Sequence, residues 1–444
     1  MPQIDGSESK IDGDRTADIA ILGAGYSGLW SAYYLKKLIP KARITIFEAA
    51  RVGFGASGRN GGWCSGFLPI SIAELAHIHG RDAAIEMMSQ SIATLDEIKS
   101  VLFAENIDCD FLQGGTIQGA TNAVQVDRVL NEVQSLRDFG YSDDDFRLMS
   151  DHELSSRISI SGLKKASFTP HCAVIHPLKL VHGLVKAVRD LGVKIIENTP
   201  VVAYQSGLVK TSEFDFRADV IVRATEGYTA QIKQHRRSLA PLYSYMVATA
   251  PLTDSQISSI GLCNRETYHD ARNMIIYSQL TKDKRIAFGG RGAPYHFASN
   301  VKPEFDNDSL IHGKIIDSMH AIFPVTKNVE ITHKWGGPLG VPRNWQPSVN
   351  FNPKSGLASL GGYVGDGVAA SNLAARTLAH LIANDNHPLT RLAWVNKTSR
   401  KWEVEPLRYI GINGLLKLAT SIDNHEQKND APARIRTKIL SALA

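Results

Sequence analysis

A run of glycines near the start of the chain constrains its fold more than any other feature. The apolar stretch 18–22 leads into three glycines with the G-x-G-x-x-G spacing, Gly23, Gly25 and Gly28. Gly23 permits a tight turn, Gly25 lets a pyrophosphate approach the backbone, and Gly28 allows close packing of a helix on its strand. The positive end of that helix favours phosphate groups. The stretch therefore predicts a strand, a phosphate-binding turn and a helix over residues 27–38.

The next segment supports the same interpretation. Residues 43–47 form a second apolar run that ends at Glu48, about twenty residues after Gly28, where an acidic side chain accepts hydrogen bonds from ribose hydroxyls. A G-x-G-x-x-G alone is weak evidence, because glycines occur in many loops. Here two strands, a helix and an acidic residue accompany it in the required order. We therefore expect a Rossmann-like dinucleotide site and not an ordinary glycine-rich turn.

Residues 51–62 indicate which dinucleotide is bound. They read RVGFGASGRNGG, a backbone-lined loop that can contact a flat ring system, with Ser57, Arg59 and Asn60 as donors. A domain that binds NAD would enter its next helix here, so the loop favours FAD. At this point the sequence resembles the FAD-dependent amine and amino-acid oxidases, a family that includes D-amino-acid oxidase, sarcosine oxidase and glycine oxidase. GASGRNGG is most similar to its gamma-glutamylputrescine oxidoreductase branch.

A second glycine-rich stretch lies far along the chain. In residues 357–383 a strand runs into GGYVGDGV, and a helix is expected to begin near Val368. Amides at a helix start favour negative charge, which a reduced flavin carries around N1 and the C2 carbonyl. We therefore expect both glycine-rich stretches to converge on one flavin. We interpret Asp366 as a turn or cap residue and not as a catalytic acid.

The resemblance implies an α/β fold, in which a Rossmann-like, glutathione-reductase-like FAD-binding domain is interleaved with an antiparallel-sheet α+β substrate domain. Residues 238–333 fit the latter, because short β-type runs alternate there with turn residues. An amphipathic helix at 309–323 is expected to cover the back of that sheet. Gly114 and Gly115 are expected to form a hairpin turn within a strand at 110–120. The predicted boundaries are 17–108, 171–235 and 340–410 for the FAD-binding domain, 109–170 and 236–339 for the substrate-binding domain, and 411–444 for a C-terminal helical tail.

The FAD is expected to contact both glycine-rich stretches and the strand ends between them. The resemblance implies that backbone groups of Val201 or Val202 hold the adenine and that Ala224 and Thr225 lie beside the dinucleotide. Covalent attachment is not expected, since no cysteine follows Cys263. The candidate cofactor-binding residues are Gly23, Gly25, Tyr26, Ser27, Gly28, Glu48, Ala49, Arg51, Gly55, Ala56, Ser57, Arg59, Asn60, Gly61, Gly62, Val202, Ala224, Thr225, Gly362, Tyr363, Gly365, Gly367 and Val368.

This cofactor predicts the chemistry. An amine held against the flavin can pass a hydride from its α-carbon to flavin N5, and water then hydrolyses the imine to an aldehyde or keto product. The protein must position that carbon, exclude bulk water and keep the amine neutral, which burial favours. No strong base is required, and no metal site is expected. Reduction of oxygen to hydrogen peroxide would follow, favoured by a cation such as Lys334, Arg291 or His333.

Aromatic and cationic residues on the expected cleft strands are candidate substrate contacts. Tyr363 is the first candidate, because the second glycine-rich stretch places it beside the flavin. Trp335 and Trp345 follow, and Arg272 or Arg291 could pair with a substrate carboxylate or phosphonate. We interpret His176 as a turn residue before a helix. Further candidates are Tyr243, Tyr245, His269 and Tyr277.

Composition limits the partners. The 444 residues carry a net charge of +5 without a dense Lys/Arg block, which argues against nucleic-acid binding. The four cysteines form no C-x-x-C pair, which argues against a zinc site or a disulfide framework and fits a reducing compartment. No window approaches the roughly 18 apolar residues of a membrane span. The acidic residues 1–16 are expected to be a flexible leader and not a signal peptide. We therefore expect a cytoplasmic protein.

Three functions stay open at this stage. The first is an oxidase of primary amines or acylated diamines, with oxygen as acceptor. The second is an oxidase or dehydrogenase of N-alkyl or D-amino acids, including aminophosphonates, in which a carrier can take the electrons. The third is a non-catalytic flavin-binding subunit. The mildly amphipathic end of the chain, ARIRTKILSALA, predicts a surface helix, and a membrane-surface contact there would favour the dehydrogenase.

Overall fold

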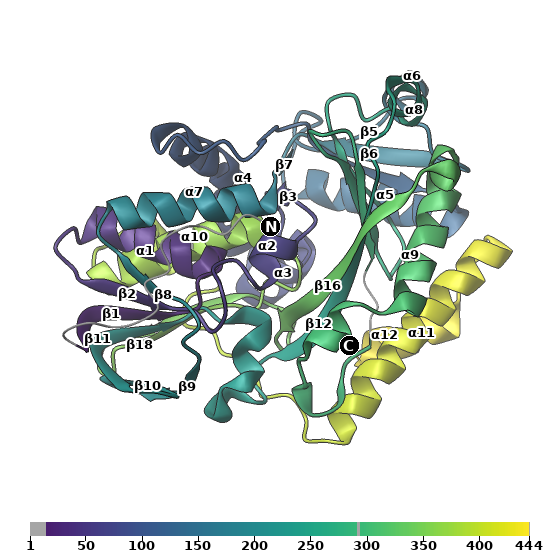
Figure 1. The fold of residues 1–444 in the computed structure, drawn as a ribbon. Helices are drawn as coiled ribbons and strands as arrows, with labels where there is room; N and C mark the ends of the chain where they lie inside the picture. The colour runs from purple at the N-terminus through teal and green to yellow at the C-terminus, as the bar shows by residue number, and fades with distance from the viewer. Residues whose placement is uncertain (1–14, 291–293, 444) are drawn as a thin grey trace.

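A largely parallel sheet forms one half of the molecule (Figure 1). The computed structural model describes residues 15–290 and 294–443. Five strands run parallel in the order β18, β11, β1, β2, β8. Antiparallel strands extend the sheet, β17 beside β18 and the pair β10 and β9 beside β11. Their bounds are β1 (Thr16–Leu22), β2 (Ile44–Phe47), β8 (Lys194–Ile196), β9 (Val201–Gln205), β10 (Leu208–Thr211), β11 (Asp215–Arg223), β17 (Ser348–Asn352) and β18 (Leu357–Gly361).

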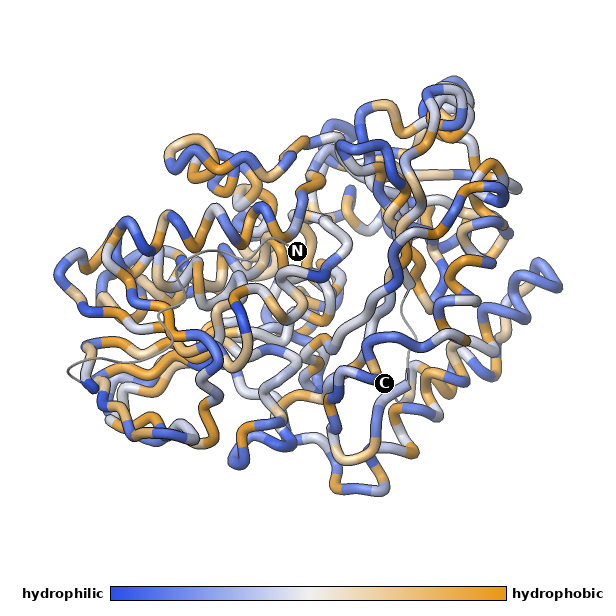
Figure 2. Tube along the Cα trace, viewed as in Figure 1, coloured by the Kyte–Doolittle hydropathy of each residue, from blue (hydrophilic) through white to orange (hydrophobic). Residues whose placement is uncertain are grey.

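Strand alternation divides the side chains of this sheet between two apolar layers. Ile19 and Ile21 of β1 belong to the largest buried core, which packs beneath the helices. Ala20 and Leu22 belong to a second core on the side of β9 and β10. Figure 2 shows hydrophobic residues gathered along these strands and the helices above them. The covering helices are α1 (Tyr26–Leu38), α7 (Pro177–Asp190) and α10 (Gly367–Ala383).

A second sheet stands beside the first and is antiparallel except where β4 pairs with β13. Its strand order is β16, β12, β15, β14, β13, β4, β6, β5. Helix α9 (Ser309–Ile322) covers its back, and Ile315 and Met319 pack there, as the sequence predicted. The strands are β4 (Thr116–Ala120), β5 (Arg147–Leu148), β6 (Lys165–Thr169), β12 (Ala240–Thr249), β13 (Thr267–Asp270), β14 (Ile276–Leu280), β15 (Ile286–Gly290) and β16 (Ile331–Val341).

Shorter elements connect and cover the two sheets. The short helix α2 (Ala56–Arg59) lies in the first glycine-rich loop, and β3 (Trp63–Ser65) pairs with β7 (Cys172–Val174). Helix α11 lies on the side of the second sheet away from the first (Figure 1). The remaining helices are α3 (Ile72–His79), α4 (Arg81–Ala104), α5 (Ala123–Asp138), α6 (Asp151–Arg157), α8 (Asp254–Ile260), α11 (Leu407–Asn429) and α12 (Arg434–Leu443), with a 3-10 turn η1 (Glu226–Gln231).

This arrangement confirms the predicted fold class and corrects one local expectation. Gly114 and Gly115 form no hairpin turn, because β4 begins only at Thr116 and pairs with β6 and β13. Gly114 is needed for packing, since a Cβ there would lie 2.2 Å from the Asn264 carbonyl oxygen. The domain boundaries given above stay our proposal.

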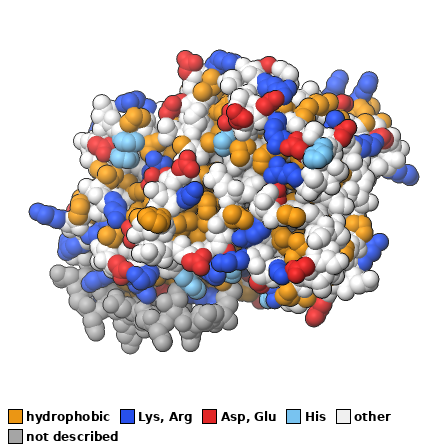
Figure 3. Space-filling view, turned by 90° about the horizontal axis from the view of Figure 1, so that it is seen from above, with side chains coloured by type: hydrophobic (Ala, Val, Ile, Leu, Met, Phe, Trp, Pro, Cys, Tyr) orange, Lys and Arg blue, Asp and Glu red, His pale blue; other side chains and the backbone are white. Residues whose placement is uncertain are grey.

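Three further observations concern the charges on the surface, the lengths of the helices and the start of α7. On the face drawn in Figure 3, Lys and Arg side chains are interspersed with Asp and Glu side chains. None of the described helices combines the length and apolar character needed to cross a bilayer. His176 caps the start of α7, where its Nδ1 accepts the Lys179 N–H at 3.4 Å, in agreement with the interpretation as a turn residue.

Candidate functional site

The turn between β1 and α1 has room only for glycine. Gly23 adopts a φ of +105°, and a Cβ there would lie 2.6 Å from the Ala224 carbonyl oxygen. A Cβ on Gly28 would lie 1.9 Å from the Gly23 carbonyl oxygen. Gly25 precedes α1 and supplies no side chain to cap its first amides. The backbone at this helix start is therefore positioned for an anion, as the sequence predicted.

Glu48 fixes the same turn from the end of β2. Its carboxylate accepts the N–H groups of Ala24 at 2.8 Å and Ala50 at 3.0 Å. Burial raises the pKa of Glu48, and these two amide contacts oppose that rise. Ala49 and Arg51 follow on an exposed loop. Val202, whose backbone was expected to hold the adenine, lies within β9 and is 48% exposed.

The three side chains expected as donors in the first glycine-rich loop are engaged by protein groups. Ser57 Oγ accepts the Tyr26 N–H at 2.8 Å. Asn60 donates to the Ser57 carbonyl at 2.9 Å and accepts the Gly62 N–H at 2.8 Å. These bonds shape the loop.

Arg59 joins this loop to the second sheet. Its guanidinium donates to Asp306 at 2.6 Å, to the Gly336 carbonyl at 3.0 Å and to the Tyr228 hydroxyl at 2.8 Å. The Trp335 indole N–H donates to the Arg59 carbonyl at 2.8 Å. No sequence pattern indicated Asp306, because it lies outside every glycine motif. Arg59 therefore holds the two halves of the molecule together beside the expected cofactor.

The second glycine-rich stretch contacts the first directly. The Tyr363 hydroxyl lies 3.0 Å from Ser27 Oγ, across 336 positions of sequence. Gly362 and Gly365 adopt φ values of +81° and +106°, which favour glycine. Asp366 stands at the start of α10 and makes no side-chain cap hydrogen bond. The predicted convergence of the two stretches is therefore present in the structure.

Glu226 holds the second stretch in place. Its Oε1 accepts the N–H groups of Gly362 at 2.9 Å and Tyr363 at 3.0 Å. Burial raises the pKa of Glu226 to about 7, and the amide contacts act in the opposite direction. Ala224 and Thr225 precede it at the end of β11, as expected.

A cavity of about 650 Å³ lies between the two sheets. The first loop contributes Asn60 and Gly61 to its lining, and the second contributes Gly365 and Asp366. Apolar side chains make up much of the wall, including Met246. Within the described residues no cluster of three His, Cys, Asp or Glu side chains could hold a metal ion. The cavity therefore connects the expected flavin site to the second sheet.

Three predicted substrate contacts line this cavity: His269, Arg272 and Tyr277. Tyr243 and Tyr245 do not, since both are buried in the core against α9. Alternation along β12 explains this difference, because Ser244 and Met246 take the cavity side. The sequence predicted a strand at β12 but did not show which of its side chains face the cavity.

The other predicted contacts lie elsewhere. Tyr363 is buried with its hydroxyl against Ser27, on the cofactor side. Trp345 is 39% exposed and is not part of the cavity lining. Lys334 and His333 are exposed on β16. Arg291 lies outside the described residues.

A group of charged and polar side chains at the second sheet was not anticipated. Gln118 donates to Glu132 at 2.9 Å, and both line the cavity. Asp270 is buried behind Arg272 and forms an ion pair with its Nε. Burial raises the pKa of Asp270 to about 6, and the Arg272 charge opposes that rise. Both signs of charge are therefore present at this wall.

Comparisons with known proteins agree with this site. Residues 18–381 match the model of a family described as FAD dependent oxidoreductase. A probable oxidoreductase OrdL from Haemophilus influenzae is 30% identical over 387 residues, which is 84% of each chain. Gamma-glutamylputrescine oxidoreductase from Escherichia coli is 26% identical over 376 residues, 83% of this chain and 84% of that protein. The structure of glycine oxidase from Geobacillus kaustophilus superposes with a TM-score of 0.72 at 18% identity and covers 86% of this chain and 100% of that one.

Proposed function

The chain belongs to the FAD dependent oxidoreductase family, and from that premise we propose that it oxidises the C–N bond of an amine that carries an acidic group at its far end. Its cofactor is FAD, and it acts on amines or amino acids. One observation carries the finer proposal. The cavity runs from the two glycine-rich loops to a wall that presents Arg272 and Glu132.

The residues present fit FAD. The Gly23 turn and the start of α1 would hold the pyrophosphate, and Glu48 would accept hydrogen bonds from the ribose hydroxyls. The backbone of the loop at Asn60 and Gly61 and the start of α10 would hold the flavin ring. We retain the full set of cofactor-binding residues predicted above on this basis. We propose that the FAD is bound non-covalently, because the sequence has no cysteine after Cys263 to form a link from the second glycine-rich stretch.

When bound, the flavin accepts a hydride from the substrate α-carbon. The chain's own part is to orient that carbon, exclude water and keep the amine neutral. Met246, Trp63 and Leu339 give the cavity an apolar wall that disfavours a charged amine. Tyr277 is held by a hydrogen bond of 2.7 Å between its hydroxyl and Ser244 Oγ, so its ring is fixed at this wall.

Arg272 and Glu132 favour a particular substrate class. The Arg272 guanidinium can pair with a carboxylate or phosphonate, and Glu132 can pair with an ammonium group. An acylated diamine with an amino-acid head group presents both charges at one end and a reactive amine at the other. Gamma-glutamylputrescine, which the Escherichia coli relative is named for, has this form. N-alkyl or D-amino acids and aminophosphonates are the second candidate class.

The electron acceptor is proposed separately. We propose oxygen, which would give hydrogen peroxide, with a carrier as the alternative. The family is one of oxidoreductases, so we do not propose a non-catalytic subunit. Three buried free cysteines, Cys64, Cys109 and Cys172, fit a reducing compartment, and we propose a cytoplasmic location.

An anaerobic bleaching experiment tests the substrate class. The purified yellow protein is mixed without oxygen with gamma-glutamylputrescine, putrescine, N-methylglycine, D-alanine and an aminophosphonate. We expect the first compound to bleach the flavin fastest. Bleaching by putrescine at the same rate would refute the requirement for an acidic head group. Readmission of air with peroxide formation identifies an oxidase, and persistent bleaching identifies a dehydrogenase.

A further inference from the structure

Helix α11 touches the segment that carries Arg272. The family match ends at residue 381, and α11 spans Leu407–Asn429, so this helix is an addition to the matched region. It lies on the outer side of the second sheet, where the connection between β13 and β14 reaches it (Figure 1). That connection comprises residues 271–275 and includes Arg272 at the cavity wall.

Asp423 of α11 binds this connection through both carboxylate oxygens. Its Oδ1 accepts the Asn273 backbone N–H at 2.9 Å and the Asn273 side-chain amide at 2.7 Å. Its Oδ2 accepts the Met274 N–H at 2.8 Å. Three hydrogen bonds to a carboxylate therefore fix the two residues that follow Arg272.

Glu426, one helical turn later, holds the residue before Arg272 by way of Arg128. The Arg128 guanidinium donates to Glu426 at 2.8 Å and to the Ala271 carbonyl at 2.9 Å. The Glu426 side chain is only 2% exposed, whereas the Arg128 side chain is 29% exposed and lines the cavity. Arg272 is thus flanked on both sides in sequence by residues that α11 fixes.

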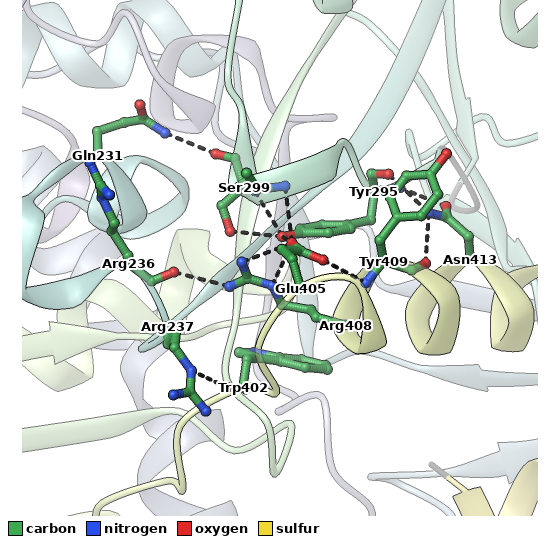
Figure 4. Close-up of polar contacts among 11 residues, drawn as sticks. Gln231, Arg236, Arg237, Tyr295, Ser299, Trp402, Glu405, Arg408, Tyr409 and Asn413 are labelled. Atoms are coloured by element: carbon green, nitrogen blue, oxygen red, sulfur yellow. Dashed lines mark hydrogen bonds and ion pairs between the residues drawn. The ribbon is translucent and has the colours of Figure 1, made fainter.

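The first turn of α11 is itself anchored to the body of the protein (Figure 4). Arg408 donates to Glu405 at 2.9 Å and to the Arg236 carbonyl at 3.0 Å. Glu405 also accepts the Tyr295 hydroxyl at 2.7 Å. Asn413 exchanges two hydrogen bonds with the Tyr295 backbone, each of 3.0 Å. The helix is therefore fixed at its start and can transmit that position to the residues near its end.

We propose that α11 is a substrate-specificity element, in which Asp423 and Glu426 position Arg272 to bind the acidic group of the substrate. This inference rests on the proposed function, because Arg272 is the carboxylate ligand there. Among the described residues, the ion pair of Arg272 is with Asp270 through Nε. The side chain is 25% exposed at the cavity, so its terminal amino groups can reach a substrate carboxylate. Asp423 and Glu426 are positioning residues and touch no substrate.

The test compares Asp423→Ala with Asp430→Ala. Asp430 caps the end of the same helix, and its carboxylate also accepts hydrogen bonds, from the Ala123 N–H at 2.5 Å and from Lys164 at 2.7 Å. Neither partner lines the cavity, so this variant controls for loss of a helix contact. Each FAD-loaded variant is assayed with 6-aminohexanoate and with hexylamine, which differ in the terminal carboxylate. Hydrogen exchange is measured for the amides of residues 271–276.

We expect Asp423→Ala to raise KM for 6-aminohexanoate by about tenfold with little change in kcat, and to leave the KM for hexylamine unchanged. The Asn273 and Met274 amides should lose protection. Asp423→Asn should restore part of the amide protection and part of the affinity for 6-aminohexanoate, since its side-chain oxygen can still accept a hydrogen bond. Asp430→Ala should match the wild type in KM and in this exchange.

Three results would overturn the inference. Unchanged protection of residues 271–276 in Asp423→Ala would show that α11 does not fix the connection, whatever the substrate. Equal KM increases for both amines, or none for either, would show that the connection does not govern carboxylate binding. A wild-type enzyme that handles both amines alike, with normal loss of protection in Asp423→Ala, would instead refute the role of Arg272 in the proposed function. In that case α11 would fix the connection without any effect on specificity, so the inference would fail as well.

Discussion

The Glu226 carboxylate accepts the backbone N–H of Tyr363 at 3.0 Å, although the two residues are 137 positions apart. Glu226 begins the 3-10 turn η1, three residues after the central strand β11 ends at Arg223, and Tyr363 lies in the glycine-rich stretch before α10. The bond therefore ties the loop expected at the flavin to the centre of the first sheet. A buried carboxyl in this position makes the loop sensitive to pH.

Stability should fall with rising pH because of Glu226. The ordinary carboxyl pKa of 4.5 is raised to about 7 by burial, so the folded protein retains a proton that the unfolded chain has lost between these values. The free energy of unfolding therefore decreases as pH rises through this window, by an amount on the order of 1–3 kcal/mol. Urea unfolding of wild type and Glu226→Gln at pH 5, 6, 7 and 8 measures this. In Glu226→Gln the free energy of unfolding should fall less with rising pH than in the wild type. The same pH dependence in both proteins would contradict a raised pKa at Glu226.

Gly23→Ala should abolish FAD binding. The φ of +105° is unfavourable for alanine, and the added Cβ would lie 2.6 Å from a backbone oxygen that cannot move away alone. We expect a purified protein without yellow colour that takes up no added FAD, as followed by the flavin absorbance. Gly313→Ala in α9 is the matched control, because its Cβ meets nothing within 4 Å and a helical alanine stabilises by roughly 0.5–1 kcal/mol. A yellow Gly23→Ala protein would refute the turn as the pyrophosphate site.

Arg272→Ala should weaken the binding of acidic substrates more than that of neutral ones. Loss of a charge-assisted pair costs on the order of 1.5–3 kcal/mol, or a KM about 10 to 100 times higher, with a smaller effect on kcat. The KM of Arg272→Lys for acidic substrates should lie between those of the wild type and Arg272→Ala, because lysine keeps the charge but cannot form a bidentate pair. Steady-state kinetics with an amine and its carboxylate-bearing counterpart checks this. Arg285→Ala is the control, since Arg285 pairs with Asp283 away from the cavity. Equal losses for both substrates would count against the pairing.

Arg59→Met should destabilise the protein more than the double variant Arg59→Met/Asp306→Asn. The Arg59 and Asp306 side chains are 18% and 22% exposed and lie 2.6 Å apart, so removal of one leaves a partly buried charge without its partner. We expect the single variant to lose about 2–4 kcal/mol of unfolding free energy. The second change should recover part of that loss. Chemical denaturation of wild type, both single variants and the double variant gives the coupling energy, and additive losses would show that the pair is not coupled.

Local sequence determined the cofactor turn and the order of the elements around it. Gly28 and Glu48 act on the backbone of the turn itself, at Gly23 and Ala24, so their spacing carried the information. The strand before Gly361 and the helix after Asp366 were readable for the same reason. The antiparallel character of the second sheet was also predictable. Short β-type runs separated by turn residues indicate neighbouring strands that run in opposite directions.

Tertiary structure alone decided which side chains meet at the cavity. The register of β12 placed Ser244 at the cavity and Tyr243 in the core, because one residue of shift exchanges the two faces of a strand. The contact of Asp423 with Asn273 joins segments 150 positions apart, and no local pattern records such a partner. The sequence thus determined the fold and the cofactor, which depend on backbone conformation within short segments. The packing of distant segments decided the substrate wall, because the free energy of those contacts exists only once both sheets and α11 are in place.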